Sequence, residues 1–358
     1  MGFDAETLSS ATETLEAGAL TSLVAATVAA PDDVITVRGL SKRYGAVEAV
    51  RGIDLDVHRG EIFGFLGPNG AGKSTTISVL CTLVGATGGS AVVGGYDVNS
   101  HPQQVRARIG LVFQEPSLDN QLTARENLYF HAMVYGVPRH ERNRRIEAAF
   151  EMVELTDRAD AQVITYSGGM KRRLEIARGV LHYPEVLFLD EPTIGLDPQT
   201  RAKVWEHLRE VRQRTGTTIF MTTHYMEEAE WCDRIAIIDH GRIVSLGTPD
   251  QLKNQMGGDV VVVTTSDNAR ATRQIEEQFG VTALHDDGTL RIDVAAGAEF
   301  VPKLVKALDV EVRTVTVRRP SLDDVFLKLT GRAIRDDEVD QGAATRAMMA
   351  RRWQGGRR

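Results

Sequence analysis

The sequence is poor in cysteine and lacks any apolar run long enough to cross a bilayer. Its two cysteines, Cys81 and Cys232, stand alone without a CxxC spacing, which argues against a disulfide framework and against a zinc site. The apolar stretch over 17–30 is short, contains Thr21 and Ser22, and follows acidic residues where a secretory signal carries basic ones. If this chain works at a membrane, we therefore expect it to do so as a peripheral subunit.

The sequence also lacks a basic surplus and any internal repeat. The 42 Lys and Arg residues are outnumbered by 49 Asp and Glu residues, which gives a formal net charge of −7. Nucleic-acid-binding domains more often carry excess positive charge, so we expect no nucleic-acid partner. With 42% hydrophobic and 25% charged residues, the 358-residue chain has the composition of a globular protein with one large α/β domain and a smaller one.

Short apolar runs recur between residues 34 and 255, and they alternate with helical stretches. Near-continuous apolar strands of this kind indicate a mostly parallel sheet that is covered by helices on both faces. Apolar residues at helical spacing over 123–155, with many charged residues between them, predict an inserted helical region. The strands of the main sheet are expected at 62–66, 109–113, 186–189, 219–222 and 235–238.

Three further segments flank this α/β domain. Residues 1–33 are interpreted as an N-terminal extension, partly helical or disordered, that ends near Pro31. Residues 259–331 predict a small α+β domain with strands at 259–265, 290–294 and 310–317. Its last run, 321–331, is amphipathic and stops at Gly331, so we expect a helix packed on this same domain. Residues 332–358 form a charged tail, first acidic and then basic, which is expected to be disordered.

Residues 67–75 match the phosphate-binding pattern GxxxxGK[ST], between an apolar strand and a helix expected at 75–83. Glycine allows backbone conformations that other residues resist, so successive N–H groups can surround phosphate oxygens. Lys73 is expected to reach the β- and γ-phosphates, and the Ser74 hydroxyl to bind Mg²⁺. The alternative is a chance glycine-rich turn, which the strand–loop–helix context disfavours. The predicted nucleotide contacts are Gly67, Pro68, Asn69, Gly70, Ala71, Gly72, Lys73, Ser74 and Thr75.

Two carboxylates, Asp190 and Glu191, follow directly after the apolar run over 186–189. Asp190 is placed to support the shell of a magnesium ion, and Glu191 to polarise an attacking water as general base. An acidic turn after a strand is the plainer alternative. The sequence Ser167-Gly168-Gly169 precedes another helix, where Ser167 is either a simple N-cap or part of a second phosphate-binding helix N-terminus.

The order of these motifs resembles the ATP-binding cassette (ABC) family over about residues 34–247. The resemblance implies a P-loop NTPase of the α/β class, with a RecA-like core, an antiparallel β subdomain and a helical subdomain at about 115–165, followed here by the small α+β domain. It implies ATP and Mg²⁺ as ligands. It assigns adenine stacking to Tyr44, metal binding to Ser74, Gln114 and Asp190, and catalysis to Lys73, Gln114, Glu191 and His224. Across a dimer, it assigns contact with the γ-phosphate to Ser167, Gly168 and Gly169, and contact between the subunits to Leu196 and Asp197.

Two positions depart from the usual signature of that family. Tyr166 and Met170 stand where the family usually has Leu and Gln. The Ser-Gly-Gly core between them is intact, and both Glu191 and His224 are present. We therefore expect an active ATPase.

The resemblance further implies a head-to-tail homodimer, in which each ATP lies between the phosphate loop of one subunit and the Ser-Gly-Gly segment of the other. A separate integral-membrane permease would complete the transporter at the cytoplasmic face of the cell membrane, docking over residues 114–135. Residues 259–331 resemble the C-terminal region of daunorubicin/doxorubicin-resistance ATPases, which implies export of drugs, antibiotics or lipids. The alternatives are a soluble ABC-type ATPase and a nucleotide sensor that is not coupled to transport.

Overall fold

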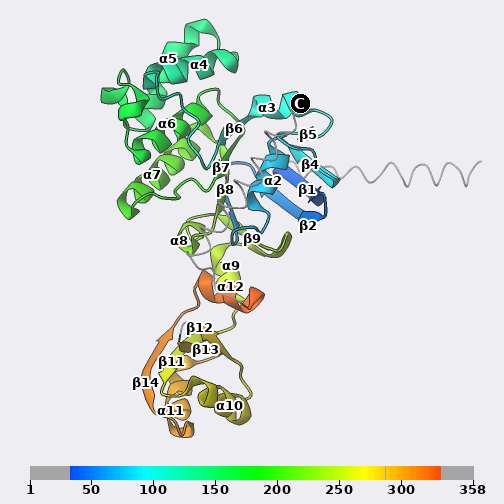
Figure 1. Ribbon diagram of the computed structural model, residues 1–358, viewed down its shortest axis with the longest axis vertical. Helices are drawn as coiled ribbons and strands as arrows, with labels where there is room; N and C mark the ends of the chain where they lie inside the picture. The colour runs from blue at the N-terminus through cyan, green and yellow to red at the C-terminus, as the bar shows by residue number, and fades with distance from the viewer. Residues whose placement is uncertain (1–32, 287, 332–358) are drawn as a thin grey trace, which may run out of the picture. The chain divides into compact units, whose positions relative to one another are not determined.

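In the computed structural model, residues 33–286 and 288–331 are described, and they form three β-sheets with surrounding helices (Figure 1). The predictions for the N-terminal extension and for the charged tail lie outside the described residues, apart from Asp33, which begins the first strand. The first sheet has the order β2-β1-β4-β5, with antiparallel pairing of β4 to β1 and to β5. Its strands are β1 (Asp33–Tyr44), β2 (Val47–His58), β4 (Gly88–Val93) and β5 (Tyr96–Asp97).

The second sheet has six strands in the order β10-β9-β3-β8-β7-β6. Only β10 runs antiparallel to its neighbour, so the mostly parallel sheet expected from the sequence is confirmed. The strands are β3 (Ile62–Leu66), β6 (Ile109–Val112), β7 (Val186–Asp190), β8 (Thr218–Thr223), β9 (Arg234–Asp239) and β10 (Arg242–Gly247).

The apolar runs of this sheet are continuous because both of its faces are buried. Phe63, Phe188 and Phe220 lie in a core shared with the first sheet, whereas Ile62 and Leu187 lie in a core on the opposite face. The second core is closed by the long helix α7 (Pro198–Thr215), together with the short α8 (Met226–Ala229) and α9 (Pro249–Asn254). The α/β domain also contains the helices α2 (Lys73–Leu80), after β3, and α3 (Pro102–Arg108), before β6.

A helical part is inserted between β6 and β7, as the sequence predicts (Figure 1). Its own core extends from Leu118 to Leu181 and includes Leu128 and Phe150. A capping box between Thr123 and Glu126 starts the first of its helices. The helices are α4 (Ala124–Val134), α5 (Arg139–Met152) and α6 (Gly168–Val180), with 3₁₀ turns at Thr156–Arg158 and Val163–Thr165.

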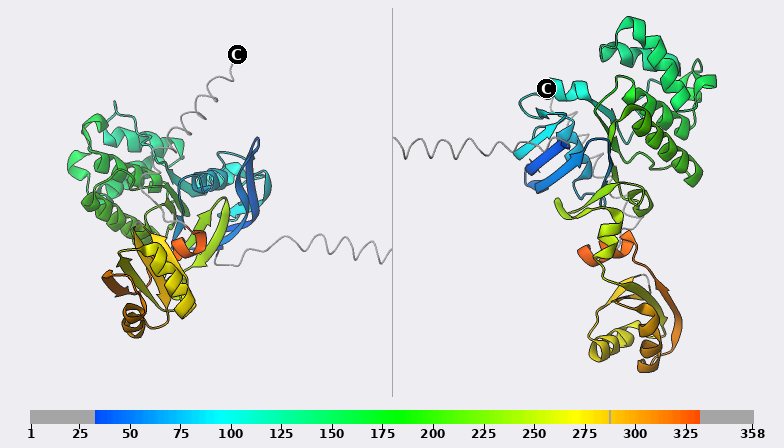
Figure 2. Two further views of the ribbon diagram at one scale, coloured as in Figure 1. Left: turned by 60° about the horizontal axis from the view of Figure 1, so that its bottom comes forward. Right: turned by 180° about the vertical axis from the view of Figure 1, so that it is seen from behind.

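The third sheet, seen from two further directions in Figure 2, has the antiparallel order β12-β13-β11-β14. Ile275 of α10 and Leu304 of α11 pack on Val261 and Val263 of its central strand. The short strand β12 was not predicted from the sequence, and within the described residues it pairs only with β13. The elements are β11 (Asp259–Thr265), α10 (Asn268–Phe279), β12 (Ala283–Asp286), β13 (Thr289–Val294), α11 (Gly297–Ala307) and β14 (Val312–Arg318).

The last described helix, α12 (Leu322–Thr330), corrects one expectation. It contacts α8 and α9, and its side chains Leu322, Val325 and Phe326 are buried in the core that also holds Leu252. The expectation that this helix packs on its own small domain was therefore wrong for its apolar face. An amphipathic pattern gives the face that is buried but does not say which core buries it.

The polar face of α12 forms hydrogen bonds with the third sheet. Asp324 accepts hydrogen bonds from Arg291 of β13 at 2.9 Å and from Arg318 of β14 at 2.7 Å. The hydroxyl and N–H of Ser321 also bond to this carboxylate. Burial raises the pKa of Asp324, but the Arg318 and Ser321 contacts outweigh it and the net pKa is lowered. One helix thus connects the small domain to the α/β domain.

Replacing Phe326 by Ala should lower the free energy of unfolding by about 3–5 kcal/mol, because the ring is only 1% exposed and its removal leaves a cavity. Urea unfolding of the full-length chain measures this change. Leu329→Ala is the matched control, since Leu329 lies on the same helix but is 41% exposed, and its effect should stay within about 0.5 kcal/mol. Equal effects of the two substitutions would contradict the burial of α12 in the α/β core.

None of the helices within residues 33–286 and 288–331 is both long enough and apolar enough to cross a membrane.

Candidate functional site

The phosphate loop lies between β3 and α2, and its glycines are required by geometry. Gly70 and Gly72 have φ angles of 81° and 109°, which side chains disfavour. A Cβ atom on Gly67 would lie 2.3 Å from the carbonyl oxygen of Ile238, and one on Gly72 would lie 2.5 Å from that of Ala49. The loop is therefore held against two neighbouring strands, and the N-terminus of α2 follows it directly, as an anion site requires.

The Lys73 side chain is folded back into this loop. It is only 4% exposed, and its Nζ donates to the carbonyl oxygens of Gly67 at 2.7 Å and of Pro68 at 3.2 Å. The same Nζ lies 3.2 Å from Oε1 of Glu191. A buried ammonium group needs such partners, so Lys73 is charge-compensated inside the site.

Ser74 and Asp190 meet beside Lys73, at the start of α2 and the end of β7. The Ser74 hydroxyl donates to Oδ1 of Asp190 at 3.2 Å, and the Thr222 hydroxyl donates to the same oxygen at 2.6 Å. Burial raises the pKa of Asp190. A hydroxyl and a carboxylate at this spacing form an oxygen donor set, which fits a hard cation such as Mg²⁺.

Glu191 follows with a φ of 47°, a left-handed conformation that is strained for a side chain of this type. Its N–H donates to the Thr222 hydroxyl at 3.0 Å, and its Oε2 accepts no hydrogen bond from any described residue. Burial alone would raise its pKa, but His224 and Lys73 outweigh burial and lower the pKa to about 2. Glu191 is therefore an ionised carboxylate with one oxygen directed to no protein donor among the described residues.

His224 completes this group from the end of β8. Its Nδ1 lies 3.5 Å from Oε1 of Glu191, and its ring packs on Tyr225 at 4.1 Å between centroids. The structure thus brings together Lys73, Ser74, Asp190, Glu191 and His224.

The Ser167-Gly168-Gly169 segment begins α6 in the helical part. The Ser167 hydroxyl accepts from the N–H of Met170 at 3.3 Å and so caps the helix. A Cβ atom on Gly169 would lie 2.4 Å from Cγ2 of Thr200 in α7, so glycine allows the two helix starts to approach closely. Asp197 caps that second helix.

Gln114 lines a recess of about 190 Å³ together with Gly168 and Leu196. The predicted metal-contacting glutamine is therefore next to the Ser-Gly-Gly segment and the predicted dimer-contact loop of its own chain. Tyr44 is half exposed near Thr75, with Nζ of Lys42 at 4.9 Å from its ring centroid.

The two departures from the family signature have a structural explanation. Tyr166 is buried in the core of the helical part, and its hydroxyl donates to the carbonyl oxygen of Arg158 at 2.6 Å. Met170 packs against the same core. Both side chains serve packing, and neither displaces Ser167 from its position as N-cap.

Two buried charged residues next to the site, Arg172 and Glu228, were not predicted from the sequence. The carboxylate of Glu228 accepts from the Thr223 hydroxyl at 2.6 Å and from the Thr193 hydroxyl, which joins the segment before His224 to the segment after Glu191. Burial raises the pKa of Glu228. In the sequence both residues lie in charged helical stretches that resemble solvent-exposed surface, so no local signal identifies them.

Two family models match the chain: "ABC transporter" over residues 50–194, and "ATP-binding protein DrrA1-3-like, C-terminal domain" over residues 247–330. A daunorubicin resistance ATP-binding protein of Streptomyces coeruleorubidus is 41% identical, covering 86% of this chain and 98% of the relative. A linearmycin resistance ATP-binding protein of Bacillus subtilis (strain 168) is 39% identical, and the match covers 85% of this chain and 100% of the relative. A Nod factor export ATP-binding protein of Ralstonia nicotianae is 39% identical, and the match covers 85% of this chain and 95% of the relative.

Solved structures with the same fold include an ATP-binding subunit of an ABC transporter, with a TM-score of 0.57 and 32% identity, covering 63% of this chain and 93% of that chain. Another is a dimeric ATP-binding cassette in a post-hydrolysis state with ADP and Pi. Its TM-score is 0.55 at 26% identity, covering 60% of this chain and 98% of that one.

Proposed function

Because this chain belongs to the ATP-binding subunits of ABC transporters, a family of ATPases, we propose that it powers the export of a drug, antibiotic or lipid through a separate membrane permease. The names of its relatives, which refer to daunorubicin resistance, linearmycin resistance and Nod factor export, support this class of cargo. The observation that carries the proposal is the convergence of Lys73, Asp190, Glu191 and His224 on one phosphate loop.

The contacts of Lys73 suggest how binding activates the site. When ATP binds, the Lys73 ammonium group leaves the carboxylate of Glu191 and pairs with phosphate oxygens of ATP, because the phosphates carry more negative charge. Glu191 thereby loses a cationic neighbour, and the pKa of its carboxylate rises from about 2. A carboxylate of higher pKa is a better general base, so Glu191 becomes able to take a proton from the attacking water.

The other residues hold charge and geometry around that step. His224 holds the γ-phosphate and orients the water beside Glu191. Ser74 and Asp190, with Gln114, would hold Mg²⁺, which neutralises phosphate charge when bound. Tyr44, whose ring is partly exposed near Thr75, stacks on adenine.

The Ser-Gly-Gly segment supports a homodimer of cassettes. Its residues form the N-terminus of the 13-residue helix α6, where free N–H groups and the helix dipole favour an anion. We assign that anion as the γ-phosphate of ATP on the opposite subunit, with Leu196 and Asp197 at the dimer contact. A homodimer provides two such composite sites from one type of chain.

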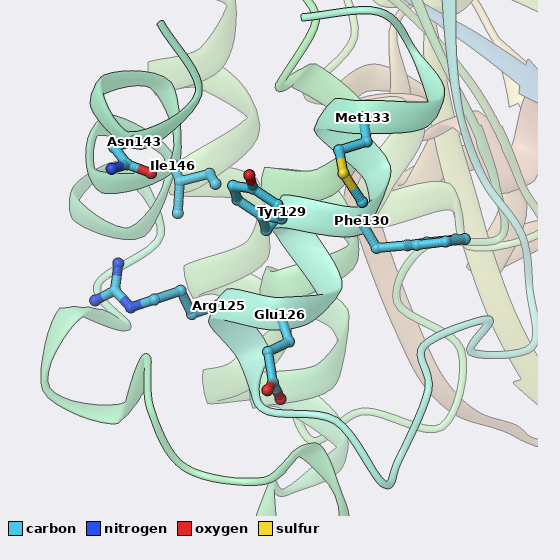
Figure 3. Close-up of a pocket in the computed structure, with 7 residues that line it drawn as sticks. All are labelled: Arg125, Glu126, Tyr129, Phe130, Met133, Asn143 and Ile146. Carbon is cyan, nitrogen blue, oxygen red and sulfur yellow. The ribbon is translucent and has the colours of Figure 1, made fainter. Parts of the chain in front are cut away.

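The permease is proposed to dock on exposed apolar side chains of α4. Phe130, Met133 and Tyr129 line a pocket of about 300 Å³, together with Arg125 and other residues (Figure 3). Phe130 is 60% exposed. Solvent-exposed clusters of large apolar side chains often mark protein interfaces, and this one lies within the expected docking range 114–135. We propose that a cytoplasmic segment of the permease covers it, which places the chain at the cytoplasmic face of the membrane.

Replacing Phe130 by Asp should abolish transport-coupled ATPase activity in permease-containing vesicles, while the basal ATPase activity of the isolated chain stays within about twofold. The reason is that removing an aromatic anchor from an interface costs about 2 kcal/mol or more, roughly 30-fold in affinity for the permease. Val305→Asp is the matched control, since Val305 is also exposed, at 46%, but belongs to α11 and not to α4. Unaltered coupling in Phe130→Asp would contradict this docking surface.

The function as a whole is tested by affinity purification of the full-length chain from its native membranes. Co-purification with a polytopic membrane protein that stimulates ATP hydrolysis is the expected result. Association with ribosomes or DNA in its place would indicate a soluble ABC-type ATPase. An absence of ATP turnover with the permease present would indicate a nucleotide sensor.

A further inference from the structure

Arg172, on the first turns of α6, donates four hydrogen bonds to two segments at the ends of strands of the catalytic sheet. Its side chain is only 6% exposed. Its Nη2 donates to the carbonyl oxygens of Asp190 at 3.3 Å and Glu191 at 3.1 Å, and its Nε donates to that of Pro192. Its Nη1 donates to the carbonyl oxygen of Phe113 at 2.5 Å, directly before Gln114.

A fifth bond completes the set, from Nη1 of Arg172 to Oε2 of Glu175 at 3.2 Å. An arginine has five N–H donors in a fixed planar arrangement, so these five acceptors use its full capacity. Three of the acceptors are consecutive carbonyl groups, from Asp190 to Pro192. Three carbonyls converge on one cation only if the backbone turns sharply around it, so Arg172 determines the shape of this turn.

This turn contains the strained residue of the site. Glu191 has a φ of 47°, and side-chain-bearing residues keep such a conformation only where their surroundings hold it. The N–H of Glu191 is held by Thr222, while its carbonyl group is held by Arg172. Together they fix both peptide groups of the residue that carries the proposed general base.

The same arginine lies five positions after Ser167, on the helix whose N-terminus is proposed to meet the partner's ATP. Glu175 of that helix also accepts from the N–H of Ser117 at 2.8 Å, in the segment that follows Gln114. A displacement of α6 must therefore carry the Glu191 turn and the Gln114 segment with it, or break buried hydrogen bonds.

From this geometry we infer that Arg172 is a positioning residue for ATP hydrolysis, which sets the backbone of Glu191 from the helix that carries the Ser-Gly-Gly segment. Arg172 touches neither nucleotide nor water in this role and acts only through Glu191. The inference rests on the proposed function of Glu191 as general base. It extends that function by linking the general base at one ATP site to the helix whose N-terminus is proposed to contact the ATP of the opposite subunit.

The first test compares Arg172→Met with Lys171→Met in the full-length chain. Because a displacement of about 1 Å in a catalytic group costs about 100-fold in rate, Arg172→Met should lower kcat by about that factor and leave the affinity for ATP within about threefold. Lys171 is the adjacent cation on α6 and bonds to Asn120, so Lys171→Met should keep kcat within about twofold of wild type. A wild-type kcat in Arg172→Met would overturn the inference.

Arg172→Lys covers the case in which Arg172→Met does not fold. Lysine keeps the charge beside Glu175 but has three N–H donors in place of five and no planar fork, so it cannot keep all five bonds. We therefore expect kcat to fall by about 10-fold with unchanged ATP affinity. A wild-type kcat in Arg172→Lys would count against the positioning role. So would a loss in ATP affinity as large as the loss in kcat, because that result indicates a general structural role.

A double-mutant cycle with Glu191→Gln separates this inference from the proposed function. If Arg172 acts through Glu191, adding Arg172→Met to Glu191→Gln should lower the residual rate by less than about threefold. A further loss of about 100-fold would show that Arg172 acts independently and would overturn the inference. Full turnover in Glu191→Gln alone would refute the role of Glu191. An inactive Glu191→Gln with wild-type kcat in both Arg172 variants would refute only the role of Arg172.

Discussion

Glu191→Gln is expected to bind ATP with wild-type affinity but to hydrolyse it at least about 100-fold more slowly, since a positioned general base contributes about 10²–10⁴-fold. The side chain keeps its size in this variant but loses the ionised oxygen that has no donor among the described residues. Steady-state release of phosphate and a nucleotide-binding titration on the same preparation measure the two effects.

The same variant should accumulate as an ATP-bound dimer, because the bound nucleotide stabilises the closed state and is not removed. Size-exclusion chromatography with and without ATP detects this dimer. Glu206→Gln is the matched control, since Glu206 is an exposed carboxylate on α7. This variant should keep wild-type turnover and should elute as wild type does, with and without ATP. Normal hydrolysis by Glu191→Gln would eliminate Glu191 as the base.

Lys73→Ala is expected to weaken ATP binding by about 10- to 150-fold, as the loss of a charge-assisted hydrogen bond of about 1.5–3 kcal/mol implies. The substitution has a second unfavourable consequence. Glu191 Oε1, now 3.2 Å from Nζ of Lys73, would remain in the site without its cationic partner and would repel phosphate oxygens.

Calorimetric titration of the full-length chain with ATP and Mg²⁺ measures this loss. Lys203→Ala removes a lysine that is 58% exposed on α7 and should bind ATP as wild type does. If Lys73→Ala also bound ATP with unchanged affinity, the loop over 67–75 would not be the main phosphate site.

The elements that depend on short-range pattern were predictable. The strands of the parallel sheet, the phosphate loop and the acidic end of β7 each combine a continuous apolar run with a local motif. The sequence placed Asp190 and Glu191 at a strand end, and the parallel arrangement of β7 and β8 brings that end next to the end that precedes His224. Ser74 also comes close to Asp190 in this arrangement, since α2 follows β3, which pairs with β8 on the side opposite β7.

Other features had no local signal. The helix α12 has an apolar face that would suit either domain, and only the fold shows that Phe326 is in the α/β core while Asp324 bonds to the third sheet. Arg172 stands in the charged run Lys171-Arg172-Arg173, which has the composition of a solvated helix surface. The strained φ of Glu191 is likewise absent from the sequence pattern, because glutamate does not favour that conformation by itself.

The amino-acid sequence alone determined the type of chemistry, because phosphate binding and water activation require particular residue types at fixed spacing along the chain. Only the tertiary structure decided which buried charges hold those residues in place. Arg172 and Glu228 act on backbone and hydroxyl groups that are between 5 and 59 positions away in sequence. Such partners are selected by the packing of helices on the sheet, and a pattern of neighbouring residues contains no information about them.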